Sequence, residues 1–191
     1  LGIAGVILED QEWPKRCGHL EGKRIIAMEE HVEKMRAARF ASGESGLVIV
    51  ARTDARADLG LEEAIRRGKA YYEAGADVIF IEAPQTEEEL GEIPSALPDI
   101  PLLANMIVGG KAPCLSAQDL EKLGFKLGVF ALSGLFAATK GIEDCFRFLK
   151  ENGTTSGFEK RSLLADYKEI ISIKKYQELE GKFSIRKPHT E

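Results

Sequence analysis

Short apolar runs alternate with stretches of helical periodicity along most of the chain. Five runs of strand length lie at residues 2–8, 46–51, 77–81, 101–104 and 125–130. After the first run, Met28, Val32 and Met35 have the spacing of one helix face, which predicts a helix from about Met28 to Phe40. Strands that are apolar throughout and are each followed by a helix are typical of a parallel sheet covered on both faces.

Helix starts and stops support the same order of elements. The pairs Thr86 with Glu89 and Ser116 with Asp119 have the capping-box spacing, so a helix is predicted after each pair. Pro94 is expected to limit the length of the first of these helices. A further helix is predicted between the second and third runs, with Gly75 as its stop and one side made by Leu61, Ile65, Gly68 and Tyr72.

The last part of the chain is predicted to be helical. A helix should run from Ser133 to Asn152, where Asn152 and Gly153 form a stop signal, and another helix should start near Ser156. Residues 184–191 are predicted to be a frayed tail. We therefore expect two parts, residues 1–153 with the five βα units and residues 154–191 as a helical segment.

Five βα units fit either an open doubly wound sheet or a barrel that lacks some of its repeats. A complete eight-unit barrel usually needs about 250 residues. The chain has 191 residues, does not begin with Met, and starts inside the first apolar run. The expectation from the sequence is that an N-terminal portion is missing.

Composition narrows the class of protein and its partners. The chain is 44% hydrophobic and 30% charged, with a formal net charge of -5 and basic residues interspersed among acidic ones, so nucleic acid is not an expected partner. No apolar run approaches the roughly 20 residues that span a bilayer, and no signal peptide opens the chain. We therefore expect no membrane partner and a cytoplasmic location.

The three cysteines, two of the histidines and the tryptophan have no common pattern, so each has its own expected setting. Cys17, Cys114 and Cys145 are an odd number at irregular spacing, which indicates reduced thiols and not a disulfide framework or zinc cluster. Cys114 is expected in a loop and Cys145 in helix packing, neither with a chemical role. His31 and His189 are expected to face solvent. Trp13 is expected to pack or anchor a loop.

Candidate chemistry gathers directly after the apolar runs. Ligands of parallel α/β folds bind at the carboxyl ends of the strands. The polar residues found there are Glu9, Asp10, Gln11, Arg52, Thr53, Asp54, Glu82, Asn105 and Ser133. If these residues converge on one rim, their carboxylates, guanidinium and amide would suit an anionic oxygenated substrate and a hard cation.

The loop after the first run carries the sharpest single candidate, Cys17. Lys15, Arg16 and His19 surround Cys17, and basic neighbours favour the reactive thiolate form, although an ordinary surface cysteine fits equally well. Gly18 favours a functional role because it lets backbone approach a ligand closely.

Arg52 also has two interpretations. It either binds an anionic ligand or makes a structural ion pair with Asp54 or Glu82, and without a fold argument the ion pair would be favoured.

Several motifs together resemble the isocitrate lyase and phosphoenolpyruvate mutase superfamily. The segment Glu9-Asp10-Gln11 followed by Lys15-Arg16-Cys17-Gly18-His19 resembles its signature loop, and the resemblance extends over Leu1 to Gly153. The other matching segments are Ala51-Arg52-Thr53-Asp54-Ala55, Ala74-Gly75-Ala76-Asp77, Glu82-Ala83 and Ala104-Asn105-Met106. The chain is most similar to the 2-methylisocitrate lyase and 2,3-dimethylmalate lyase branch, and Trp13-Pro14 favours the dimethylmalate type.

The resemblance implies a fold and a role for each matching residue. The fold is a TIM (β/α)8 barrel, here without its N-terminal βα units, and the expected assembly is a homotetramer that exchanges helices within Ser156 to Glu180. Glu9 would hold Mg, or Mn in its place, through water, with the main aspartate ligands upstream of Leu1. The implied catalytic residues are Cys17, Arg52 and Glu82, and the implied substrate-binding residues are Gly18, His19, Arg52, Asn105 and Ser133.

The activity implied by the resemblance is carbon–carbon bond cleavage. The substrate would be a small 2-hydroxy di- or tricarboxylate, which yields a 2-oxo acid and a carboxylate. Ala131, Ser133 and Val108 depart from the pattern of the lyases, so oxaloacetate hydrolase and carboxyphosphonoenolpyruvate phosphonomutase activities remain alternatives. A non-catalytic barrel fragment that serves as an assembly or binding module is the alternative of another class.

Overall fold

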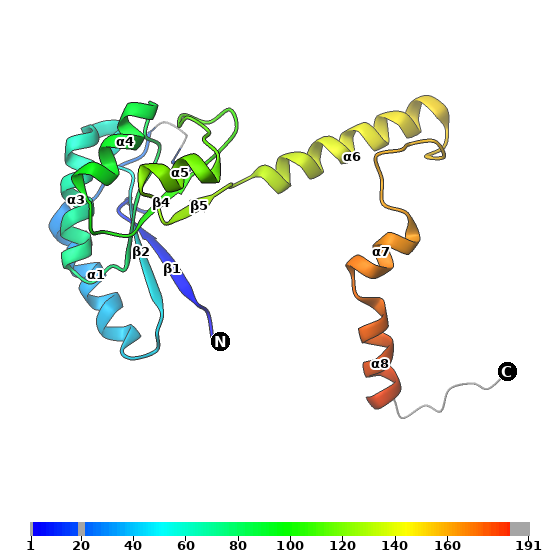
Figure 1. Cartoon of the computed structure of the whole chain (residues 1–191), viewed down its shortest axis with the longest axis horizontal. Helices are drawn as coiled ribbons and strands as arrows, with labels where there is room; N and C mark the ends of the chain where they lie inside the picture. Colours follow the sequence, from blue (N-terminus) through cyan, green and yellow to red (C-terminus); the bar gives the residue numbers. More distant parts are fainter. Residues whose placement is uncertain (1, 19–21, 184–191) are drawn as a thin grey trace. The chain divides into compact units, whose positions relative to one another are not determined.

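Five strands pair side by side in chain order and form one parallel sheet. The computed structural model describes residues 2–18 and 22–183. The strands are β1 (Gly5–Glu9), β2 (Val48–Thr53), β3 (Val78–Ile81), β4 (Leu102–Asn105) and β5 (Leu127–Val129). Each strand is hydrogen-bonded in parallel to the next one along the chain. The parallel pairing predicted from the sequence is confirmed, but the expected cover on both faces is not, because the helices of the described βα units lie on one face of the sheet (Figure 1).

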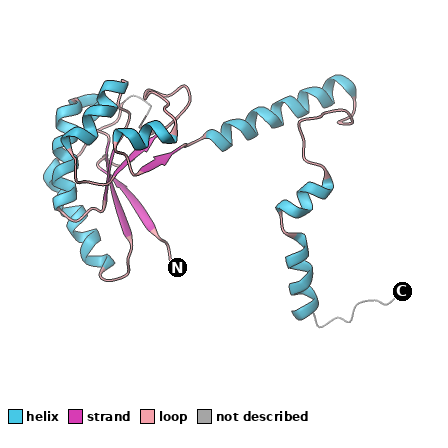
Figure 2. Ribbon diagram, viewed as in Figure 1, coloured by secondary structure: helices cyan, strands magenta, loops and turns pink. Residues whose placement is uncertain are grey.

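The helices that follow these strands lie on one side of the sheet (Figures 1 and 2). They are α1 (Met28–Ser42), α2 (Arg56–Leu59), α3 (Leu61–Glu73), α4 (Glu87–Ala96) and α5 (Ala117–Leu123). Beyond β5 the chain forms α6 (Ser133–Asn152), α7 (Leu164–Ile170) and α8 (Ile173–Phe183). No helix among the described residues combines the length and the apolar character that crossing a membrane requires.

Alternation along the strands divides the side chains between two faces of the sheet. Ile49 and Ala51 are fully buried in the main core under the helices. Val50 faces the other way and joins Val78, Phe80 and Leu103 in a second buried cluster. The residue that follows Val50 on this second face is Arg52, so the face becomes polar toward the carboxyl ends of the strands.

The predicted strands are all present, with shifted ends. The second strand begins and ends two residues later than predicted, at Val48 and Thr53, and the first begins at Gly5. The fifth strand is shorter than predicted: only Leu127–Val129 is paired, and all three residues are exposed. An apolar run therefore marks each strand, whereas hydrogen bonding to the neighbouring strand decides its length.

Both predicted N-terminal caps are present, since Thr86 and Ser116 accept hydrogen bonds from the backbone N–H groups of Glu89 and Asp119 at 3.2 Å each. The helix predicted from Ser133 to Asn152 has those bounds. Pro94 lies inside its helix and does not limit it, because α4 continues to Ala96.

Two further expectations about helices need correction, and one helix was missed. No helix starts near Ser156; the next helix begins at Leu164, and the intervening Gly157 has a positive φ of 89°, which departs from helical geometry. The short α2 was not predicted. The predicted face of α3 is only partly right: Gly68 is buried and Leu61 and Ile65 pack against the core, but Tyr72 is exposed. The other buried residues of the helix are Ala64, Arg67 and Tyr71.

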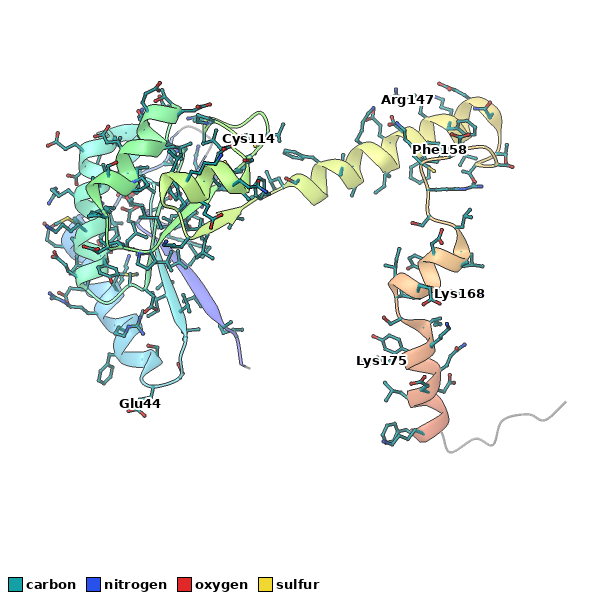
Figure 3. All side chains as sticks on the ribbon, in the orientation of Figure 1. Glu44, Cys114, Arg147, Phe158, Lys168 and Lys175 are labelled. Atoms are coloured by element: carbon teal, nitrogen blue, oxygen red, sulfur yellow. The ribbon has the colours of Figure 1, made fainter. Side chains whose placement is uncertain are left out.

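The chain divides into two compact units, Leu1–Gly134 and Leu135–Glu191. In the second unit, the Phe148 and Phe158 rings contact each other with their centroids 5.8 Å apart. Many other apolar side chains of α6, α7 and α8 are exposed, and Figure 3 shows them projecting from the helices. The predicted domain boundary after residue 153 and the exchange of the last helices remain predictions. The predicted tail at 184–191, which includes His189, lies outside the described residues.

His31 is buried, and the expectation that it faces solvent was wrong. Only 1% of the residue is exposed, and its ring lies edge-on against Tyr71 with the centroids 4.5 Å apart. The ring lies near the backbone of Leu8, but neither nitrogen reaches hydrogen-bonding geometry. Burial lowers the pKa of His31 to about 4; Asp10 opposes this shift, and Lys34 and Arg67 add to it.

Because of this burial, acid should destabilise the protein through His31. The folded state holds His31 neutral below its ordinary pKa of 6.5, so the unfolded state binds more protons between pH 6.5 and about 4. The stabilisation is complete above pH 6.5 and is lost as the pH falls to about 4. Replacing His31 by Met should flatten the slope of the unfolding free energy by up to about 1.4 kcal/mol per pH unit in this window.

Chemical denaturation at a series of pH values measures the slope. Met35→Leu, at a buried and non-titrating position of the same helix, is the matched control and should keep the wild-type slope. An unchanged slope in His31→Met would contradict the prediction.

Candidate active site

Arg52 lies at the centre of a cluster of carboxylates at the carboxyl end of β2. Its Nε and Nη2 donate to the two carboxylate oxygens of Asp54, each at 2.8 Å. Its Nη1 lies 3.1 Å from Oε2 of Glu82, and its Nε lies 3.6 Å from Oε2 of Glu9. The structural ion pair considered from the sequence is thus present, and it involves Asp54 and Glu82 together.

The register of the strands brings these groups together. Glu9 is paired with Arg52 across β1 and β2, and Glu82 directly follows β3, where its backbone N–H donates to the carbonyl of Thr53 at 3.0 Å. Asp54 and Glu82 are buried, and the guanidinium carbon of Arg52 lies 5.2 Å from the centre of the Phe80 ring. Burial alone would lower the pKa of Arg52, but its hydrogen bonds to Asp54 and the nearby acidic charges raise it.

Gly18 lies directly against this cluster. A Cβ atom placed on Gly18 would be 2.5 Å from Nη2 of Arg52, 2.5 Å from Cγ of Glu82 and 2.9 Å from Oδ1 of Asp54. These separations are too short for non-bonded atoms, so any larger residue would displace the loop or the cluster. The next residue toward the N-terminus, Cys17, is exposed and joined to Gly18 by one peptide bond.

Two side chains anchor the loop around Cys17. Gln11 donates from Nε2 to the carbonyl of Arg16 at 2.9 Å and accepts from the Arg16 N–H at 2.8 Å. Buried Lys23 donates to the carbonyl of Gly18 at 2.7 Å. The loop leaves the body of the protein at Gln11 and returns at Ile25, and an antiparallel bridge joins these two residues.

Glu9 is the carboxylate of the Arg52 cluster that lines a hollow open to solvent. Its carboxylate lies 2.9 Å from Lys15 Nζ, and the residue lines a hollow of about 680 Å³ beside the loop and α1. Among the described residues, no set of three or more His, Cys, Asp or Glu side chains is arranged to hold a metal ion. The described residues therefore do not by themselves form a magnesium site.

The remaining candidates are placed differently. Asn105 ends β4 and donates from Nδ2 to Oε1 of Glu82 at 3.4 Å, while its buried Oδ1 has no partner among the described residues. Ser133 is exposed at the start of α6, and no described contact joins it to Arg52. His19 lies outside the described residues. Trp13 is 86% exposed, so the expectation that it packs was wrong.

The expectation that Asp10 lies on the same rim as Glu9 was also wrong. Consecutive residues at a strand end point to opposite faces, so Asp10 turns toward the helices and is fully buried. The three cysteines are free, as predicted. The roles of Lys23 and of the Asp10 network were missed, because both arise from contacts between segments far apart in sequence.

Five parallel strands with helices on one side and polar residues at their carboxyl ends define the class of fold, which is a partial TIM barrel of the α/β type. A family model described as phosphoenolpyruvate phosphomutase matches residues 1–149. The chain belongs to this phosphoenolpyruvate mutase and isocitrate lyase superfamily.

Three relatives illustrate the similarity. The chain is 43% identical over 183 residues to the petal death protein of Dianthus caryophyllus, covering 95% of this chain and 57% of that protein. It is 42% identical over 187 residues to the chloroplastic carboxyvinyl-carboxyphosphonate phosphorylmutase of Arabidopsis thaliana, covering 96% and 55%. It is 39% identical over 184 residues to 2,3-dimethylmalate lyase of Eubacterium barkeri, covering 96% and 63%. The chain thus spans less than two thirds of each relative, and the cytoplasmic location stays a prediction.

Solved structures confirm the fold. An oxaloacetate acetylhydrolase in complex with 3,3-difluorooxalacetate has a TM-score of 0.87 and 30% identity, covering 94% of this chain and 61% of that one. A 2,3-dimethylmalate lyase gives the same TM-score and identity, covering 95% and 61%. A phosphonopyruvate hydrolase complex with oxalate and Mg²⁺ has a TM-score of 0.79 and 25% identity, covering 94% and 62%.

Replacing Gly18 by Ala should destabilise the protein. The added methyl group would overlap the Arg52 and Glu82 side chains, so either the loop lifts or the ion pairs separate. The expected loss is about 1–3 kcal/mol in the free energy of unfolding, as for overpacking elsewhere. Denaturant titration would measure it.

Gly91→Ala in α4 is the control, because a Cβ there would lie 3.9 Å from Leu123, an ordinary contact. It should be neutral or slightly stabilising, since Ala favours helices. Equal stability of Gly18→Ala and the wild type would show that the close approach is not maintained in solution.

Proposed function

We propose that the protein is a Mg-dependent carbon–carbon lyase that cleaves a small 2-hydroxy di- or tricarboxylate of the 2,3-dimethylmalate or 2-methylisocitrate type to a 2-oxo acid and a carboxylate. The observation that carries the proposal is the approach of Gly18, and with it the Cys17 segment, to the Arg52 cluster. In this proposal Cys17 is a proton-transfer group that acts beside the guanidinium of Arg52. The 2,3-dimethylmalate lyase among the relatives supports the choice of reaction.

In this proposal Arg52 binds a carboxylate of the substrate. A guanidinium has five N–H groups, and the contacts to Asp54 and Glu82 direct three of them, so two remain for an anion. Glu82 and Asn105 orient the substrate, and Oδ1 of Asn105, which has no partner within residues 2–18 and 22–183, supplies an acceptor for a substrate hydroxyl. Gly18, His19 and Ser133 complete the proposed contacts.

Cys17 acts as the proton donor. Cleavage of the bond between the hydroxyl-bearing carbon and its neighbour leaves an electron pair on a carbanion stabilised by its carboxylate. The Cys17 thiol protonates that carbon, while a base accepts the proton of the 2-hydroxyl group. The loop from Trp13 to Lys23 would exclude water from this carbanion.

Magnesium is part of the proposal because of the family and not because of this chain's geometry. The related phosphonopyruvate hydrolase complex contains oxalate and Mg²⁺. Glu9 would contribute through water, and the further ligands would come from outside the described residues. A bound cation would offset charge on the 2-oxo product.

Hydrolysis of oxaloacetate is the second candidate, because the oxaloacetate acetylhydrolase has the same TM-score of 0.87 as the 2,3-dimethylmalate lyase. Phosphonomutase chemistry is the third, supported by the similarity to the plant phosphorylmutase. A non-catalytic barrel fragment that serves as an assembly or binding module is the remaining alternative.

The full-length enzyme should release a 2-oxo acid from dimethylmalate or methylisocitrate. Measuring turnover of these two compounds and of oxaloacetate side by side separates the lyase from the hydrolase. Replacing Cys17 by Ser should lower kcat on the order of 10²- to 10⁴-fold with little change in KM, because proton transfer and not binding is impaired. Cys114→Ser, an exposed thiol in another loop, is the control and should retain turnover.

Three outcomes would count against the proposal or part of it. Turnover of oxaloacetate alone would favour the hydrolase, and no turnover of any compound would favour the non-catalytic fragment. Wild-type rates in Cys17→Ser would remove the thiol from the mechanism.

We also propose that the protein is a homotetramer in which chains exchange residues 156–180. Exposed apolar side chains recur along α6 and α8, and monomeric proteins rarely leave such faces uncovered. The residues concerned include Ile142, Phe146, Leu149, Tyr176, Leu179 and Phe183.

Replacing Tyr176 by Asp should dissociate the tetramer, because a charge would have to be buried in the apolar contact. Light scattering after size-exclusion chromatography should show the mass of four chains for the wild type and a lower mass for the variant. Gln177→Asp adds the same charge at the neighbouring exposed position and should remain tetrameric. A wild-type mass for Tyr176→Asp would contradict the proposed interface.

A further inference from the structure

The carboxylate of Asp10 is fully buried and accepts four hydrogen bonds. Thr53 Oγ1, Tyr71 Oη and Arg67 Nη1 donate to its Oδ2 at 2.7, 2.9 and 3.1 Å. The backbone N–H of Asp54 donates to its Oδ1 at 2.9 Å. With both oxygens engaged and no exposed surface, Asp10 is not available to substrate or metal.

These bonds join two parts of the candidate site. Thr53 is the last residue of β2 and Asp54 follows it, so both come directly after Arg52. On the other side, the Ile26 N–H donates to the carbonyl of Asp10 at 3.0 Å, and Arg67 Nη1 donates to the carbonyl of Ile26 at 2.9 Å. Ile26 follows the point where the loop with Cys17 returns to the body of the protein.

The two oxygens of Asp10 have separable tasks. Oδ2 holds α3 through Arg67 and Tyr71 and also accepts from the Thr53 hydroxyl at the end of β2, and these contacts lie within the core. Oδ1 holds the backbone of Asp54, whose own carboxylate takes two hydrogen bonds from Arg52. A shift of the Asp54 backbone would therefore move the guanidinium.

We propose that Asp10 is a positioning residue that fixes Arg52 through the backbone of Asp54. This inference rests on the proposed function insofar as Arg52 is taken to bind the substrate carboxylate. Asp10 touches no reacting atom, so its effect is on the placement of Arg52.

Asp10→Asn separates the two tasks. The amide of Asn has only one acceptor oxygen. That oxygen should take the place of Oδ2, because three donors face this position and one of them, Arg67, is charged. The NH₂ group then faces the Asp54 N–H, donor against donor, and the contact to Asp54 is lost. Tyr71→Phe is the matched control: it removes one donor from Oδ2 and leaves the Oδ1 contact intact.

The experiment compares both variants of the full-length enzyme by melting temperature, steady-state kinetics and amide hydrogen exchange. Both variants should melt at a lower temperature than the wild type. Asp10→Asn should lower kcat/KM on the order of 100-fold, the effect of a misplaced substrate-binding group, whereas Tyr71→Phe should stay close to the wild type. Exchange of the backbone N–H of Asp54 should be faster in Asp10→Asn only.

The outcomes distinguish this inference from the proposed function. If the wild type turns over none of the substrates, the proposed function fails, and faster exchange at Asp54 in Asp10→Asn alone still supports the positioning role. If both variants lose activity in proportion to their melting temperatures, Asp10 is only a core residue. Unchanged exchange at Asp54 in Asp10→Asn would overturn the inference as well.

Discussion

The half-buried guanidinium of Arg52 is the interaction on which the rest of the site depends. Removing one partner of a buried ion pair leaves an uncompensated charge, so Arg52 and its carboxylates constrain one another. Their positions follow from the strand register, which pairs Glu9 with Arg52 and brings Glu82 beside Thr53. A segment that approaches this cluster closely must do so without a side chain, and Gly18 meets that requirement.

Successive side chains of a strand point to opposite faces of the sheet, so the end of one strand contributes one side chain to the candidate site and the next to the core beneath the helices. Glu9 faces the open side and pairs with Lys15, whereas Asp10 faces the helices and is fully buried. The same division holds on β2, where Arg52 lies in the cluster and Thr53 bonds to Asp10. The polar rim is therefore supported from behind by a second polar network, and the two are joined at Asp54.

The features predicted correctly are mostly those that local sequence determines. The five apolar runs predict the strands, and Thr86 and Ser116 predict helix starts, because a cap needs only residues three positions apart. His31 and Asp10 were misjudged because a polar side chain is buried only where the tertiary structure surrounds it, here around Tyr71. For the candidate site, the signature motif identified Gly18, but the reason that it must be glycine lies in Arg52 and Glu82, which are distant in sequence.

The loop is held by the protein itself, and this bears on how the thiol is presented. Gln11 uses both ends of its amide on the backbone of Arg16, and Lys23 binds the carbonyl of Gly18, so the residues on either side of Cys17 are anchored without a ligand. A group held in place before the substrate arrives loses less entropy when the reaction begins. If Cys17 takes part in the reaction, the backbone on either side of it is already held by Gln11 and Lys23 before a ligand binds.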